Sequence, residues 1–220
     1  MALQHLPAPI RERLLIEIYQ QANDLDWEFL SNTEKTNQYR RWIEDPKVGG
    51  VLLSYGPEKD ARVWIKDVPM KEYARAQEGI GSYVRYAVNR FQGPEEIVRA
   101  ACGSGWVMKS DSVGEKPNHC YAIAGDGDAT RYVCWGRAGN FRDLVWAALN
   151  EAIDSVERPA IVITTRNGET VSTAERTRQE RVAQRCGADL RYLHREMIPN
   201  PDYLGAAGGG HGPSQPTLVD

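Results

Sequence analysis

The sequence predicts a mixed α/β fold organised around residues 131–197, and three patterns support this prediction. Residues 132–135 form a short apolar run that ends at Gly136. After Asn140, apolar side chains recur at the spacing of a helix, and residues 160–165 are apolar and β-branched, which is typical of a buried strand. Alternating strands and helices of this length imply parallel strands joined by crossover helices.

The N-terminal portion, residues 1–102, is predicted to combine helices with one β-hairpin. Apolar residues at helical spacing predict a first helix at residues 10–25, and Ser31 with Glu34 forms the capping-box pattern that opens a second helix. Two short apolar runs separated by the turn sequence Pro-Glu-Lys-Asp favour a β-hairpin at residues 50–66.

A long helical pattern follows at residues 70–91. Gly79 and Gly81 lie inside this pattern, and each glycine weakens a helix by about 1 kcal/mol relative to alanine, so we expect a kink or break there. Acidic residues that directly follow a Gly-Pro pair predict a short helix at residues 95–101.

The main α/β domain is predicted to span residues 103–198. A short strand at residues 106–108 comes first, and a β-hairpin follows, with strands at residues 119–124 and 131–135 on either side of the turn sequence Gly-Asp-Gly-Asp. The strand–helix–strand–helix–strand unit then ends with a helix at residues 174–185 and a strand at residues 189–193.

Composition limits the classes of protein that fit. The net charge of −3 provides no global field that would attract nucleic acid, which leaves only a local basic patch for that role. No apolar run approaches the roughly 20 residues of a membrane span, and the N-terminus lacks a signal-peptide pattern, so we expect a cytoplasmic protein without a membrane partner.

The cysteines and histidines do not fall at zinc-site spacings. Residues 199–220 are rich in Gly and Pro, and we expect a disordered tail there.

The first candidate site is a set of phosphate or nucleic-acid ligands at two strand–helix loops. Arg137, Asn140 and Arg142 follow the first strand of the unit, where backbone N–H groups and the helix dipole favour an anion. Arg166 follows the next strand, and if the two strands are parallel both loops emerge at one edge of the sheet. A helix N-cap and an Asn-Gly turn are the purely structural alternatives.

The second candidate site consists of Asp111, Asp126 and Asp128 as catalytic carboxylates. Carboxylates on neighbouring strands and turns bind Mg²⁺ or Mn²⁺ through oxygen, and Asp111 and Asp126 would be the metal ligands. Aspartates that flank a glycine are also ordinary turn residues. Closeness of the three side chains in the folded protein would favour a metal enzyme, and dispersal would count against it.

Residues 159–193 run as an apolar strand ending in Thr-Thr, a polar loop, an alanine-bearing helix, the sequence Gly-Ala-Asp-Leu and a closing strand. This pattern resembles the C-terminal half of Mrr-like restriction endonuclease domains. Residues 105–197 can be read in the order of that family: strand, strand, strand, helix, strand, helix, strand. The resemblance implies a restriction-endonuclease-like fold, for which a Rossmann-like sheet is the alternative.

In that family, an acidic residue and an E-x-K or Q-x-K triplet on the hairpin bind a metal and activate water. The expected third strand of this chain, residues 132–137, contains no acid and no lysine. Only Asp111 or Asp126 could stand for the first acid, and only Arg137 for the cation. The resemblance therefore implies a degenerate domain that binds nucleic acid, or one that uses relocated residues.

Three functions are compatible with these patterns. The first is a nucleic-acid-associated protein of microbial defence or DNA processing, with DNA or RNA as its partner. Such a protein would be a degenerate or atypical metal-dependent nuclease. The second is a nucleotide-binding α/β enzyme with a phosphate site at the strand–helix loops. The third is a non-catalytic protein-interaction module.

Overall fold

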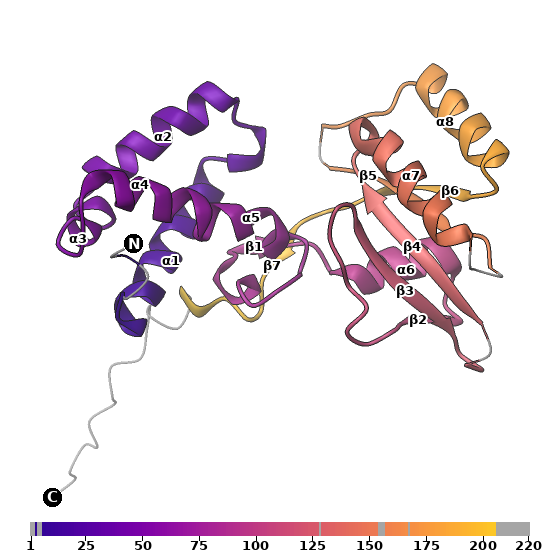
Figure 1. Ribbon diagram of the computed structural model, residues 1–220, viewed down its shortest axis with the longest axis horizontal. Coiled ribbons are helices and arrows are strands. Elements are labelled where there is room, and N and C mark those ends of the chain that lie inside the picture. The colour runs from indigo at the N-terminus through magenta and orange to yellow at the C-terminus, as the bar shows by residue number, and fades with distance from the viewer. Residues whose placement is uncertain (1–2, 4–5, 128, 154–156, 167, 206–220) are drawn as a thin grey trace, which may run out of the picture. The chain divides into compact units, whose positions relative to one another are not determined.

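The computed structural model describes residue 3 and residues 6–127, 129–153, 157–166 and 168–205. The chain forms two compact units (Figure 1), of which the first is Met1–Arg90 with Pro199–Asp220 and the second is Phe91–Ile198. Asp128 and the part of the predicted tail beyond residue 205 lie outside the described residues.

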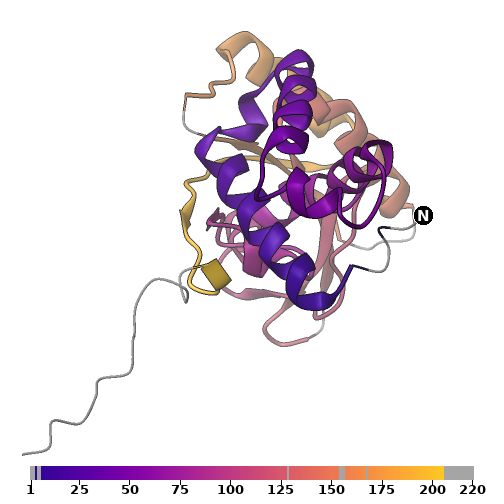
Figure 2. The ribbon, with the colours of Figure 1, turned by 90° about the vertical axis from the view of Figure 1, so that its left-hand side faces the viewer.

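Helices dominate the first unit. Its described elements are α1 (Ala8–Asp24), η2 (Trp27–Phe29), α2 (Asn32–Glu44), α3 (Gly49–Leu52), α4 (Glu58–Asp67), α5 (Pro69–Gln77), η3 (Val84–Tyr86) and β1 (Asn89–Arg90). A short strand, β7 (Ile198–Pro199), lies where the chain returns to this unit. α2 lies beside α4 and α1 beside α5 (Figure 1, Figure 2).

The predicted capping box at the start of α2 is confirmed. The Ser31 hydroxyl accepts a hydrogen bond from the Glu34 N–H at 3.3 Å, and the Glu34 carboxylate accepts one from the Ser31 N–H at 2.7 Å. Farther along the same helix, Trp42 is fully buried in the core of the unit, and its indole N–H donates to Gln21 of α1 at 2.8 Å. The capping box at the N-terminus of α2 and the burial of its apolar residues therefore both stabilise this helix.

The predicted β-hairpin at residues 50–66 is wrong, because this segment forms α3 and α4. Ala61, Trp64 and Ile65 are the buried residues of α4, and their spacing of three and four is that of one helix face. Pro57, which we assigned to a turn, instead occupies the N-cap position of α4. Burial of a helical stripe overrides the β-branched character of Val63 and Ile65.

The long helix predicted at residues 70–91 breaks at the expected place. α5 ends at Gln77, and the backbone φ angles of Gly79 and Gly81 are 74° and 85°, a left-handed conformation that an L-residue rarely adopts. Beyond this break the helix does not resume, and the chain continues through η3 and β1.

The second unit is a mixed α/β domain, which confirms the predicted fold class. Its described elements are α6 (Pro94–Cys102), β2 (Trp106–Met108), β3 (Asn118–Ala124), β4 (Thr130–Gly136), η4 (Ala138–Asn140), α7 (Phe141–Ala152), β5 (Ala160–Thr165), α8 (Thr173–Arg185) and β6 (Asp189–His194). α6, which we placed in the N-terminal portion, belongs to this unit and packs on its sheet.

The five strands lie in the order β2-β3-β4-β5-β6. The first three are antiparallel neighbours, and β4, β5 and β6 are parallel, as the alternation of strands and helices predicted. Two parallel crossovers in the same direction along a sheet place α7 and α8 on one face, and α6 lies against the other (Figure 1). Within the described part of the chain, every helix is too short or too polar to cross a membrane.

Candidate functional site

The loops after β4 and β5 emerge at the same edge of the sheet, as predicted. Gly136 is paired in register with Ile163, so the two strands end side by side. Arg137 forms an ion pair with Glu169, and the second carboxylate oxygen of Glu169 accepts a hydrogen bond from the Arg166 N–H at 3.1 Å. The two loops therefore converge through Glu169, a carboxylate that we did not predict to lie there.

The predicted phosphate ligands do not form one cluster. Glu169 neutralises the Arg137 guanidinium, whereas the Arg166 guanidinium lies 4.8 Å from the centre of the Phe91 ring. Asn140 is exposed in η4 and makes no side-chain cap. The Arg142 side chain is 93% exposed and contacts Asp143 at 3.3 Å. Among the described residues of this edge, the two loops are thus joined through Glu169 and form no shared cradle for a phosphate.

Asp111 and Asp126, the two residues of the second candidate site that the structure describes, are separated along β3. Asp111 lies beside the middle of the strand, because its neighbour Ser112 accepts a hydrogen bond from the Tyr121 N–H at 3.0 Å. Asp126 lies in the turn beyond Ala124, the last residue of the strand. Three residues of strand cover about 10 Å, so these two residues lie far apart along the strand. Among the described residues, no three His, Cys, Asp or Glu side chains are arranged to hold a metal.

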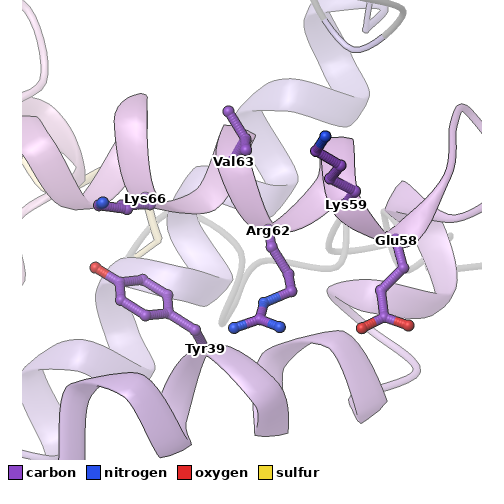
Figure 3. Close-up of a pocket in the computed structure, with 6 residues that line it drawn as sticks. All are labelled: Tyr39, Glu58, Lys59, Arg62, Val63 and Lys66. Atoms are coloured by element: carbon purple, nitrogen blue, oxygen red, sulfur yellow. The ribbon is translucent and has the colours of Figure 1, made fainter. Parts of the chain in front are cut away.

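The first unit contains a groove that we did not predict, between α2 and α4. Its volume is about 550 Å³, and it is lined by Tyr39 of α2 and by residues of α4. Lys59, Arg62 and Lys66 stand on one face of α4, at spacings of three and four residues, and Figure 3 shows Arg62 reaching toward α2. The carboxylate of Glu58 lies at one end of the groove (Figure 3).

The three cations of this groove differ from three arginines of the second unit that have acidic partners. Arg131, Arg137 and Arg195 are each paired with an acidic side chain. Within the described residues, by contrast, none of the groove cations makes a hydrogen bond or ion pair with an acidic side chain. Among the described residues, the groove is therefore lined by three cations and one carboxylate, Glu58, which leaves an excess of positive charge on this surface.

Tyr39 provides a fixed aromatic group in the groove. Its ring packs edge-on against Trp27 at 5.5 Å and against Trp42 at 5.8 Å between ring centres. Burial, followed by the charge of Asp67, raises the pKa of the Tyr39 hydroxyl above its ordinary value, so the side chain stays neutral at physiological pH. Figure 3 shows the Tyr39 hydroxyl directed toward the Lys66 end of the groove.

We missed this groove because we assigned residues 50–66 to a β-hairpin, in which Lys59 lies in the turn and not on a shared face with Arg62 and Lys66. The recurrence of cations three and four residues apart, out of phase with Ala61, Trp64 and Ile65, was the available signal. Comparison of the chain with models of known protein families, with curated proteins and with solved structures finds no match.

Proposed function

We propose that this protein binds nucleic acid, and that the groove between α2 and α4 contacts the phosphate backbone of a single strand. One observation carries this proposal: three cations without acidic partners among the described residues line the same groove as a fixed tyrosine ring. A cationic groove with an aromatic group is the common design of surfaces that hold single-stranded DNA or RNA.

The dimensions of the groove suit a short stretch of backbone. The rise from Lys59 to Lys66 along α4 is about 10 Å, a length on the scale of a few neighbouring phosphates. The three cations would neutralise successive phosphates, and Tyr39 would stack on one base. Binding through these contacts tolerates any base sequence, because every base presents an aromatic face.

The order of the strands and helices in the second unit supports a place for this protein among nucleic-acid-associated proteins. Its strands and helices follow each other in the order of the restriction-endonuclease-like domains that the sequence resembles. Because Asp111 and Asp126 lie apart, we favour a degenerate domain that binds without cleaving. A microbial defence or DNA-processing role in the cytoplasm belongs to this proposal.

The test is a titration of a fluorescent single-stranded oligonucleotide, followed by anisotropy, at salt concentrations from about 50 to about 200 mM. We expect Arg62→Glu to weaken binding about tenfold or more and to flatten the dependence of the logarithm of Kd on that of the salt concentration. Arg13→Glu is the matched control, because Arg13 is exposed on α1 and does not line the groove.

Three results would overturn the proposal. The first is equal affinity of the wild-type protein and the Arg62→Glu variant. The second is an equal loss of affinity in the Arg13→Glu control, since this would indicate unspecific attraction to any positive surface. Magnesium-dependent cleavage of the oligonucleotide would overturn the statement that binding occurs without chemistry.

A further inference from the structure

The second unit contains a cleft of its own, between the first turns of α7 and the middle of α8. Its volume is about 350 Å³, near the lower limit of the roughly 300–1,000 Å³ that small-molecule sites occupy. The side chains that matter for its chemistry are Ala138, Phe141, Arg142, Val145, Arg178 and Val182.

The walls of the cleft are apolar and well supported. Ala138, Phe141 and Val145 pack against the buried core formed by β4, β5 and α7, and Val182 is half-buried on the α8 side. α8 is held in place by Gln179, whose side-chain oxygen accepts a hydrogen bond from the Tyr192 hydroxyl of β6 at 3.0 Å. The cleft therefore offers a preformed surface on which a planar ring can lie against Phe141.

Two guanidinium groups, those of Arg142 and Arg178, line this apolar surface from opposite helices. The contact of Arg142 with Asp143 is weak, because the two side chains are 93% and 65% exposed. Within the described residues, Arg178 has no acidic partner. The lining contains one carboxylate, that of Glu175. It accepts a hydrogen bond from the side-chain amide of Gln179, one turn farther along α8, at 3.2 Å.

We propose that this cleft binds a small aromatic phosphate of the size of a nucleoside monophosphate. The ring would lie against Phe141 between the two helices, and Arg142 and Arg178 would hold the phosphate with charge-assisted hydrogen bonds. The cleft lies wholly within the second unit, so this site is independent of the groove between α2 and α4. Its volume favours a mononucleotide over a dinucleotide.

The test is isothermal titration calorimetry of the full chain with AMP, with adenosine and inorganic phosphate as partial ligands. We expect AMP to bind more tightly than either partial ligand, and Arg178→Glu to weaken AMP binding about tenfold or more. Val182→Trp, which fills the cleft, should abolish binding. Arg181→Glu is the matched control, since Arg181 is exposed on the same helix outside the cleft.

Thermal melting of the Arg178→Glu and Arg181→Glu variants should be equal, which separates a loss of binding from a loss of folding. Absence of AMP binding at millimolar concentration would overturn the proposal, and so would AMP binding that both Arg178→Glu and Val182→Trp leave unchanged. Oligonucleotide binding by Arg178→Glu at the wild-type level would show that the two sites are separate, whereas its loss would overturn their independence.

Discussion

The guanidinium of Arg195 is almost fully buried, with 1% of its side chain exposed, and its Nε donates a hydrogen bond to the Glu96 carboxylate at 2.9 Å. The same guanidinium lies 4.2 Å from the centre of the Phe91 ring. These contacts join the end of β6 to the first turn of α6, although 99 residues separate Arg195 from Glu96 in the sequence. A buried charge of this kind depends on its partner, because water cannot replace the lost contact.

We therefore predict that Glu96→Ala lowers the free energy of unfolding by about 3 kcal/mol or more. Glu95→Ala is the control, since Glu95 is an exposed residue in the same helical turn and should change stability little. Chemical denaturation of both variants measures the difference. Equal stability of the two variants would show that the Arg195–Glu96 pair contributes nothing net.

The helical state of residues 58–67 can be tested by whether one substitution raises or lowers the stability of the protein. Val63 is 43% exposed on α4, and alanine is a better helix former than valine, so Val63→Ala should raise the stability by about 0.5 kcal/mol. Val107 is 59% exposed on β2, where valine is preferred, so Val107→Ala should lower it. A loss of stability in Val63→Ala would contradict the helix.

Burial raises the pKa of the Cys134 thiol to about 12, from an ordinary value of 9.0. Above pH 9 the unfolded chain loses this proton and the folded protein keeps it, so the contribution to stability is complete below about pH 9 and disappears as the pH rises toward 12. We predict that the stability difference between the wild type and Cys134→Ala shrinks over this range. Val133→Ala is the control, because Val133 is a buried neighbour without a titratable group. The stability difference between the wild type and this variant should stay constant over the same pH range.

The separation of Asp111 and Asp126 along β3 predicts how the protein responds to metal ions. Asp126→Asn should bind the oligonucleotide with wild-type affinity, both in EDTA and in Mg²⁺ at matched ionic strength, because Asp111 and Asp126 lie at different points along β3. A magnesium-dependent rise in melting temperature that Asp126→Asn abolishes would contradict this prediction. It would favour the hypothesis that the protein is a metal-dependent enzyme.

Much of the second unit could be predicted because its signals are local. The apolar strand at residues 160–165 and the helix after Asn140 each depend on residues that are neighbours in the chain, and the same holds for the break at Gly79 in the first unit. The edge at which the loops after β4 and β5 emerge followed from the parallel order of the strands.

The sequence by itself determined the mixed α/β class, the parallel strands and the capping box of α2, since periodicity and capping are read within a few residues. Only the tertiary structure decided that residues 58–67 are helical, because the stripe of Ala61, Trp64 and Ile65 needs a partner surface to bury it. It also decided that Glu169 neutralises Arg137, a pair 32 residues apart that no local pattern specifies. The cations of the α2–α4 groove share a surface for the same reason: which side chains meet depends on how the helices pack, and packing is set by the whole core.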